Sequence, residues 1–216
     1  MSAEKLTSPE EPYAKGTLFV TGGSSGIGKA IIERVGKRYT GVFNFDFQEG
    51  SEFDVRNPAS LDAQMKALQT NQVQNDLVVS AGVHIAKPFL KQTPEEIKFQ
   101  MLTNLVGAIL TVHSFLRWHE NNHHLIPPNI VIISSISARL HEDPSIAVYE
   151  ASKAGLSHFV QSLVDPEGRF VINAVEPGTI RGTKIGGWTP DFGYDNEARR
   201  GIEAAQESEV LNLHAE

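Results

Sequence analysis

Three patterns follow one another near the start of the chain and restrict the folds available to it. Residues 16–21 form a short apolar run typical of a buried strand, residues 22–28 (Gly-Gly-Ser-Ser-Gly-Ile-Gly) a tight turn, and residues 27–38 a helix with one apolar face. The glycines allow a phosphate to approach the backbone closely, and the helix N-terminus offers free N–H groups. This unit predicts a nucleotide-binding α/β domain. A plain glycine loop is the alternative.

Strand and helix patterns then alternate along most of the chain. The predicted strands cover residues 16–21, 41–46, 53–55, 76–82, 129–133 and 170–175, and the predicted helices cover 27–38, 58–71, 93–119, a segment from Tyr149, and a short one after Asp195. Right-handed crossovers arrange such strands as a doubly wound parallel Rossmann-type sheet, in the order 3-2-1-4-5-6 with helices on both faces. The crossover between residues 46 and 53 is too short for a helix and must be trimmed.

The composition excludes several functions. There are no cysteines, so disulfides and thiol chemistry are excluded, and the eight histidines show no metal-ligand spacing. A net charge of −7 argues against nucleic acid or an anionic membrane as a partner. We expect residues 1–15 to be a flexible tail, 16–185 the Rossmann domain, and 186–216 a lid and C-terminal helix of the same domain. With no signal peptide and no apolar run as long as a membrane span, the cytoplasm is the expected compartment.

An acidic residue ends the second predicted strand. Asp46 lies about 20 residues beyond the glycine turn, a position from which a carboxylate accepts hydrogen bonds from a ribose diol and repels a 2′-phosphate. This favours NAD(H) over NADP(H). The alternative is an ordinary solvated acid in a turn.

A serine, a tyrosine and a lysine follow the fifth predicted strand. Tyr149 and Lys153 stand four residues apart at the start of a helix and so share one of its faces, while Ser135 follows the strand end. A hydroxyl donor, a phenol and a cation in one pocket suffice for proton transfer to a carbonyl oxygen. A surface tyrosine and a surface lysine are the alternative.

Taken together, these motifs resemble the short-chain dehydrogenase/reductase family over roughly residues 16–185. The matching elements are Thr21-Gly-Gly-Ser-Ser-Gly-Ile-Gly28, Asp54-Val55, Ala81-Gly82, Asn104, Ser135, Tyr149-Glu-Ala-Ser-Lys153 and Pro177-Gly178. The resemblance implies that Tyr149 is the acid/base group and that Lys153 lowers its pKa and holds the nicotinamide ribose. It also implies that Ser135 binds the oxyanion and that Asn104 bends its helix and holds a proton-relay water.

The resemblance further implies a set of cofactor contacts, no metal, and a homodimer or homotetramer. The expected cofactor-binding residues are Gly22, Ser24, Ser25, Gly26, Ile27, Gly28, Asp46, Asp54, Val55, Ser80, Ala81, Gly82, Tyr149, Lys153, Pro177, Gly178, Ile180 and Thr183. The chain departs from the family where Val79-Ser80 replaces two asparagines, which predicts weaker bracing of the cofactor loop. The family's seventh strand is also not apparent.

The function predicted on these grounds is NAD(H)-dependent hydride transfer between nicotinamide and a small secondary alcohol or ketone. The alternatives are a non-catalytic NAD(H)-binding or sensing module, and a pteridine reductase, dehydratase or epimerase that uses the same residues. The sequence does not identify the substrate. Candidates for lining its pocket are Val83, His84, Ile136, Ser137, His141, Trp188 and Phe192.

Overall fold

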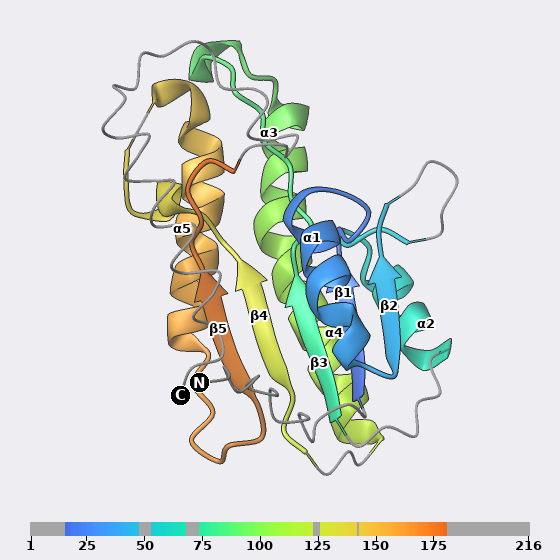
Figure 1. The fold of residues 1–216 in the computed structure, drawn as a ribbon. Coiled ribbons are helices and arrows are strands. Elements are labelled where there is room, and N and C mark those ends of the chain that lie inside the picture. Colours follow the sequence, from blue (N-terminus) through green and yellow to red (C-terminus); the bar gives the residue numbers. More distant parts are fainter. Residues whose placement is uncertain (1–15, 48–52, 68–73, 123–125, 142, 181–216) are drawn as a thin grey trace, which may run out of the picture.

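The computed structural model describes residues 16–47, 53–67, 74–122, 126–141 and 143–180, and these form one parallel sheet with helices on both faces (Figure 1). Its strands are β1 (Gly16–Thr21), β2 (Gly41–Phe45), β3 (Gln74–Val79), β4 (Asn129–Ile133) and β5 (Val171–Val175). They lie in the order β2-β1-β3-β4-β5, and every neighbouring pair is parallel. The predicted fold class is confirmed.

The prediction of a strand at residues 53–55 is wrong. Phe53 is buried and stacks on Phe45 of β2, with ring centroids 5.3 Å apart, but Asp54 begins a turn: its backbone N–H donates to Ser60 Oγ, and its carbonyl accepts from the Asn57 N–H. The predicted order 3-2-1-4-5-6 therefore loses its outermost strand in the described residues, and the other five keep their places. The alternation of apolar and polar residues that suggested a strand is explained by the burial of Phe53 and Val55, with Phe53 packed against Phe45 of β2.

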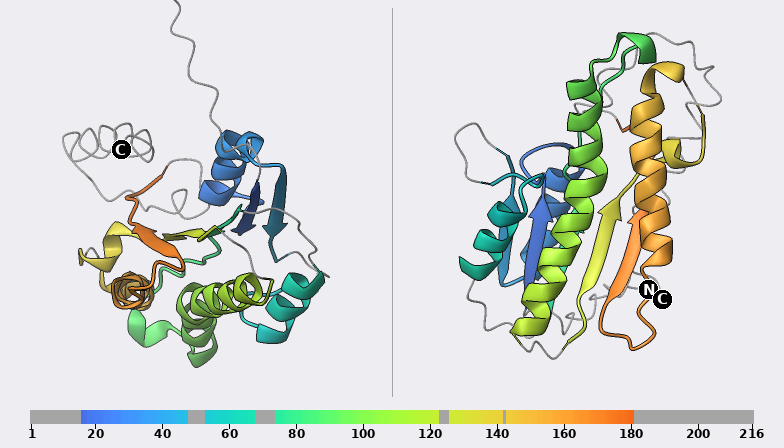
Figure 2. Two further views of the ribbon diagram at one scale, coloured as in Figure 1. Left: turned by 90° about the horizontal axis from the view of Figure 1, so that it is seen from below. Right: turned by 180° about the vertical axis from the view of Figure 1, so that it is seen from behind.

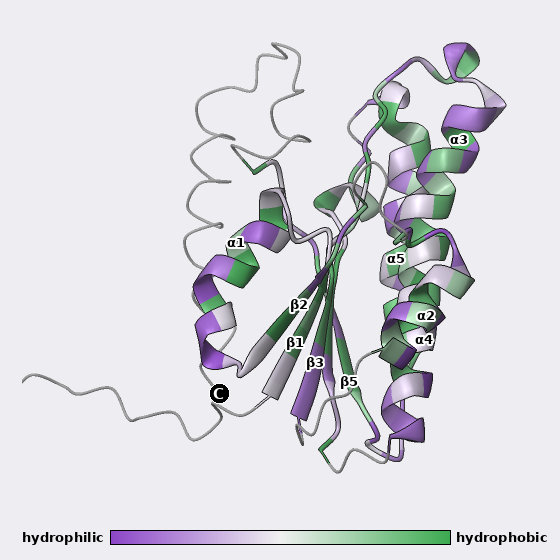
Figure 3. Cartoon of the chain, turned by 90° about the vertical axis from the view of Figure 1, so that its right-hand side faces the viewer, coloured by the Kyte–Doolittle hydropathy of each residue, from purple (hydrophilic) through white to green (hydrophobic). Residues whose placement is uncertain are grey.

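The helices form two layers of unequal size (Figures 2 and 3). One face of the sheet carries α1 (Gly26–Val35), which continues into the short helix η1 (Gly36–Arg38). The opposite face carries α2 (Pro58–Ala67), α4 (Gly107–Asn121) and α5 (Ala147–Ser162), with α3 (Pro94–Met101) extending beyond the sheet edge. Short 3-10 helices η2 (Phe89–Lys91), η4 (Ile136–Ala138) and η5 (Pro144–Ile146) lie in the loops at that edge.

The main core lies between the sheet and the larger helical layer. Phe19 of β1 is fully buried at its centre, with its ring centroid 5.4 Å from that of Phe115 and 5.3 Å from that of Trp118, both edge-on and both from α4. A second cluster, built from Leu18, Val20, Val78 and Ile133, packs under α1. Successive residues of β1 thus supply both cores, as expected for a strand covered on two faces.

The long helix predicted over residues 93–119 is present but is interrupted. Thr93 caps α3 in a capping box with Glu96, and a π-helical turn, Leu102–Val106, joins α3 to α4. Asn104 lies inside this turn, which confirms the predicted irregularity. By length and composition, Pro94–Asn121 could cross a membrane, contrary to the expectation from the sequence, but half of its most apolar window is buried inside the domain. That window belongs to a core helix, which packs on β3 and α2.

A buried carboxylate ties the strands together at the edge opposite to the glycine turn. Asp76 of β3 accepts hydrogen bonds from the Tyr39 hydroxyl (2.8 Å), the Gln74 side-chain amide (3.1 Å), and both the backbone and side-chain N–H groups of Asn129 (2.9 and 3.1 Å). Burial and the neighbouring Asp76 carboxylate raise the pKa of Tyr39 far above its ordinary value, so its hydroxyl stays a donor. One side chain therefore connects β3, the start of β4, and the turn before β2.

We expect Asp76→Ala to lower the free energy of unfolding by about 2–4 kcal/mol, because it leaves several donors unpaired in a largely buried site. Urea denaturation measures the loss. Glu167→Ala, which removes an exposed carboxylate, is the control and should change stability by less than about 0.5 kcal/mol. A loss below about 1 kcal/mol for Asp76→Ala would contradict the role assigned to this network.

Candidate active site

The glycine turn after β1 packs directly on the end of β3. Gly22 has a φ of +71°, and a Cβ at this position would lie 2.8 Å from the Ala81 Cα. A Cβ at Gly28 would lie 2.5 Å from the Gly22 carbonyl oxygen. Only glycine fits at either position without displacing the backbone. The result is a backbone cradle at the N-terminus of α1, suited to a diphosphate.

Two side chains from the end of β2 hold this turn. Asn44 Oδ1 accepts from the Gly23 N–H at 2.9 Å, and Asn44 Nδ2 donates to Ser24 Oγ at 3.0 Å. Asp46 Oδ2 accepts from the Ser24 N–H at 2.8 Å. Within the described residues, Oδ1 of Asp46 has no hydrogen bond and remains available to a ligand. Sequence reasoning missed Asn44. The sequence feature that could have identified it is an amide side chain between two phenylalanines at the ligand-binding edge of the sheet.

The end of β3 is braced by a hydroxyl. Thr21 Oγ1 accepts from the backbone N–H groups of Ser80 and Ala81, at 3.2 and 3.3 Å. These contacts lie where the family's usual asparagines are missing. Together with Asn44, they brace the cofactor loop by another route.

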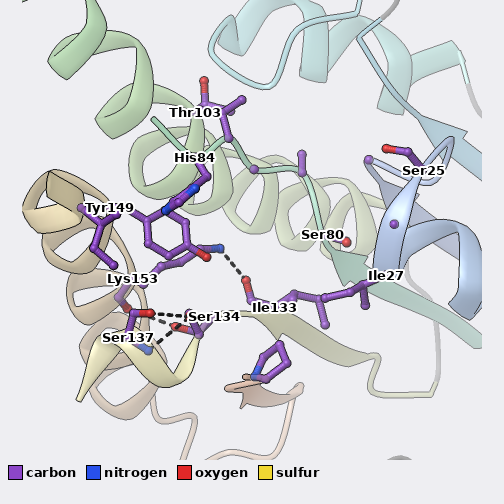
Figure 4. Close-up of a pocket in the computed structure, with 18 of the residues that line it drawn as sticks. Ser25, Ile27, Ser80, His84, Thr103, Ile133, Ser134, Ser137, Tyr149 and Lys153 are labelled. Carbon is purple, nitrogen blue, oxygen red and sulfur yellow. Dashed lines mark hydrogen bonds between the residues drawn. The ribbon is translucent and has the colours of Figure 1, made fainter. Parts of the chain in front are cut away.

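Lys153 lies in the interior, where α5 crosses the end of β4 (Figure 4). Its side chain is 5 % exposed, and its Nζ donates to the Ile133 carbonyl at 2.9 Å. Burial lowers the pKa of Lys153 to about 8. Nζ lies 5.8 Å from the centroid of the Tyr149 ring, so the cation and the phenol share one pocket, as their spacing predicted.

Tyr149 and Ser135 face the same cavity from two elements. Tyr149, in the first turn of α5, is buried, and its ring meets His84 edge-on. Ser135 follows β4 and is also buried. Its Oγ accepts from the Ser137 N–H and donates to Ser137 Oγ, each at 3.2 Å. Ser137 thus adds a second hydroxyl beside the predicted one.

Asn104 acts as a clamp on the loop after β3. Its Oδ1 accepts from the Val83 N–H and its Nδ2 donates to the Val83 carbonyl, both at 2.8 Å. Nδ2 also donates to Ser152 Oγ of α5 at 3.1 Å. A Cβ at Gly82 would come within 3.4 Å of Asn104 Oδ1 and 3.6 Å of Lys153 Nζ, so a small residue suits this place. The relay water expected at Asn104 stays a prediction.

The far end of the cavity carries an ion pair. Arg56 donates to both carboxylate oxygens of Asp54, and these hydrogen bonds hold the pKa of Asp54 below its usual value. The guanidinium carbon lies 4.8 Å from the Phe99 ring centroid and 5.9 Å from that of Phe47. A planar cation between two aromatic rings was not predicted from the sequence, because these three residues come from distant segments. The expected contact between Asp54 and the cofactor stays a prediction.

A single cavity of about 1020 Å³ joins these parts. The predicted residues that line it are Gly22, Ser25, Gly26, Ile27, Asp46, Asp54, Val55, Ser80, Ala81, Gly82, Ser135, Tyr149, Lys153, Pro177, Gly178 and Ile180, with Val83, His84, Ile136 and Ser137. Ser24, Gly28 and Asn104 are not among the residues that line it. His141 lies apart, exposed, with Nδ1 3.4 Å from Glu150. Thr183, Trp188 and Phe192 lie outside the described residues.

The cavity and its groups suit a dinucleotide cofactor. Its volume is at the upper end of the usual range for ligand sites, and the glycine cradle, Asp46 and the Tyr149–Lys153 pair lie along one sheet edge. Among the described residues, no group of His, Asp or Glu side chains could hold a metal ion. These features define an α/β protein whose cavity suits a dinucleotide and is lined by a phenol, a hydroxyl and a buried amine.

Comparison with known proteins gives the family. The profile described as short chain dehydrogenase matches residues 46–190. The chain therefore belongs to the short-chain dehydrogenase family of oxidoreductases, which bind nicotinamide cofactors.

Curated relatives include 3-dehydrosphinganine reductase TSC10B of Arabidopsis thaliana, 31 % identical over 68 % of this chain and 49 % of that protein. Another is the 3-oxoacyl-[acyl-carrier-protein] reductase MabA of Mycobacterium tuberculosis, 28 % identical over 83 % of this chain and 75 % of that protein. The chain spans about half the length of the Arabidopsis reductases that it matches.

Solved structures share the fold. A dehydrogenase/reductase from Sinorhizobium meliloti superposes with a TM-score of 0.67 at 24 % identity, over 89 % of this chain and 79 % of that one. A 3-oxoacyl-[acyl-carrier protein] reductase from Brucella melitensis gives 0.64 at 27 % identity, over 77 % and 76 %.

We expect Lys153→Met to stabilise the free protein at pH 7. The pKa of Lys153 falls from 10.5 to about 8 on folding, so burial of its charge costs about 3 kcal/mol of stability, which the variant recovers. The variant also loses the hydrogen bond to the Ile133 carbonyl, which offsets about 1–2 kcal/mol of that recovery. Urea denaturation should show a net gain of about 1–2 kcal/mol.

The pH dependence gives the sign of this effect. Between pH 8 and 10.5 the unfolded wild type binds more protons at Lys153 than the folded one, so its stability rises through this interval relative to the variant. The advantage of Lys153→Met should therefore shrink from pH 8 upward and reverse between about pH 9 and 10, where the remaining burial penalty equals the contribution of the lost hydrogen bond. A variant that is less stable than the wild type at pH 7 would contradict the assigned burial penalty.

Proposed function

We propose that this chain is an NAD(H)-dependent oxidoreductase that acts on a secondary alcohol or ketone. The observation that carries the proposal is the convergence of Tyr149, Lys153 and Ser135 on the cavity that also contains the glycine cradle. A binding or sensing module needs the cradle, and would use Lys153 to hold the ribose, but it has no use for the hydroxyls of Tyr149 and Ser135 beside that lysine. The names of the relatives, 3-dehydrosphinganine reductase and 3-oxoacyl-[acyl-carrier-protein] reductase, describe reductions of ketones and support the same reaction class.

The bound cofactor would supply or accept the hydride, and the protein would handle the proton. Tyr149 would give a proton to the substrate oxygen, or remove one, through its hydroxyl. An ordinary phenol titrates near pH 10, so it needs a nearby positive charge to act at neutral pH, and Lys153 provides one. Ser135 would donate a hydrogen bond to the same oxygen once its hydroxyl turns away from Ser137.

The preference for NAD(H) rests on Asp46. One carboxylate oxygen braces the glycine turn, and the other is available to a ribose hydroxyl. The negative charge would repel a 2′-phosphate at this position. Arg56 lies at the same end of the cavity, but its guanidinium is engaged by Asp54 and so is largely neutralised.

We expect the wild type to bind NADH at least about tenfold more tightly than NADPH, and Asp46→Ala to reduce this ratio about tenfold or more, because a charge-assisted hydrogen bond and a repulsion are both removed. Fluorescence titration measures both dissociation constants. The ratio is the proper readout, since loosening of the glycine turn would weaken both cofactors alike. Glu33→Ala, at an exposed site on α1, is the control. Equal or tighter NADPH binding by the wild type would refute the preference.

We expect Tyr149→Phe to lower kcat by about 10²–10⁴-fold with a panel of ketones and secondary alcohols, while NADH affinity stays within a few fold. The variant loses only the hydroxyl that transfers the proton. Tyr39→Phe makes the same chemical change at the opposite end of the sheet and should keep its turnover. Full activity in Tyr149→Phe, or tight cofactor binding without turnover of any panel member by the wild type, would overturn the proposed function.

A further inference from the structure

The loop after β3 is held at two points by one helix. Asn104 pairs with both backbone groups of Val83, as described, and Gln100 Oε1 accepts from the Ile85 N–H at 2.6 Å. Both amide side chains are fully buried, and they stand four residues apart on the segment that joins α3 to the π turn. The residue between the two anchored positions, His84, is therefore presented in a fixed direction.

That direction is toward Tyr149. The two ring centroids are 4.6 Å apart, with an interplanar angle of 83°, and His84 lies over the tyrosine in the cavity wall (Figure 4). Within the described residues, this ring contact is the only side-chain interaction of His84, so neither imidazole nitrogen is hydrogen-bonded there. A half-buried imidazole with unused donor and acceptor capacity beside an acid/base residue is a candidate ligand-binding group.

The cavity that His84 lines has many apolar residues in its wall. They include Val83, Ala86, Pro88, Ile136 and Ile146. Polar side chains of the same cavity are engaged locally: Asp143 accepts from the Ser145 N–H at 2.8 Å, Ser137 is bonded to Ser135, and the Thr103 hydroxyl donates to the Phe99 carbonyl at 2.8 Å. Burial lowers the pKa of His84, so the ring is neutral at pH 7 and offers one donor and one acceptor.

The two loops that form this wall are also joined to each other. The Lys87 N–H donates to the Ser145 carbonyl at 3.0 Å, and the Gln92 side-chain amide donates to the Lys87 carbonyl at 2.8 Å. Lys87 Nζ pairs with Glu96 in the first turn of α3. The wall around His84 is thus assembled before any ligand arrives, a condition for using a side chain to select substrates.

We propose that His84 is a specificity-determining residue that hydrogen-bonds a second polar group of the substrate, two or three bonds from the reacting carbon. The proposal rests on the proposed function, in which Tyr149 holds the reacting oxygen. Because His84 touches the tyrosine ring, a group that reaches the imidazole must lie only a few bonds from that oxygen. The apolar wall suits an alkyl remainder. The substrate class is therefore an apolar chain with an oxygen function close to the ketone.

The test compares two ketones of equal chain length, with the reacting carbonyl at the same position. Ethyl 3-oxohexanoate carries a second carbonyl two bonds from the reacting carbon, and 4-nonanone does not. The variant His84→Phe keeps a ring against Tyr149 but has no hydrogen-bonding group, whereas His84→Gln keeps such a group. His113→Phe, the same replacement at an exposed site on α4 outside the cavity, is the control.

We expect the ratio of kcat/KM for ethyl 3-oxohexanoate to that for 4-nonanone to fall about tenfold in His84→Phe, to fall less in His84→Gln, and to stay unchanged in His113→Phe. A purely structural role, in which His84 only supports the Tyr149 ring, would lower both kcat/KM values and leave their ratio within about twofold. That outcome would overturn the proposal.

A binding measurement separates this proposal from the proposed function. Dissociation constants of both ketones for the NADH-bound chain, measured by the change in NADH fluorescence, need no turnover. If the wild type reduces neither ketone, the oxidoreductase assignment fails for this class of compound, and the binding ratio still decides the role of His84. A ratio that falls about tenfold in His84→Phe supports the role. An unchanged ratio refutes it.

Discussion

The direct packing of the glycine turn on the end of β3 is the contact on which the site depends. At Gly22 and Ala81, the backbones of two neighbouring strands approach closely enough to exclude any side chain between them. The Thr21 hydroxyl oxygen accepts hydrogen bonds from the two backbone N–H groups that follow β3, those of Ser80 and Ala81. Because no side chain stands between the glycine turn and the end of β3, the cavity can run unbroken from Asp46 to Tyr149.

The end of the cavity that contains Tyr149 and Lys153 is built at the expense of stability. Lys153 is buried and held by the Ile133 carbonyl, so its charge has lost most of its solvation. Ser134, one residue before Ser135, anchors α5 through the Lys153 carbonyl and Ser157. The helix that carries both Tyr149 and Lys153 is thereby fixed to the strand that carries Ser135. This rigid arrangement compensates for a residue type that interiors rarely accept.

Local patterns were sufficient to predict the sheet, the glycine turn and the pairing of Tyr149 with Lys153, because each depends on residues close together in the sequence. The strand predicted at 53–55 failed because a three-residue alternation does not distinguish a strand from a turn with two buried side chains. Asn44 and Asp76 could not be assigned roles, since their partners come from distant segments. His84 was only one of several candidates for the pocket wall, because its relation to Tyr149 exists only in three dimensions.

The π turn at Leu102–Val106 has a consequence for how the long helix can change. A regular helix rotates its side chains by about 100° per residue, so an extra residue in one turn changes the phase of every position after it. Before the turn, Phe99 lines the cavity and Gln100 holds the loop after β3; after the turn, Val112 and Phe115 pack in the core. The turn therefore divides one helix into two segments, one that contributes to the ligand site and one that packs in the core. Substitutions on the first segment that reshape the pocket wall need not disturb the packing of the second segment. Substrate specificity can therefore change while the packing of the core stays the same.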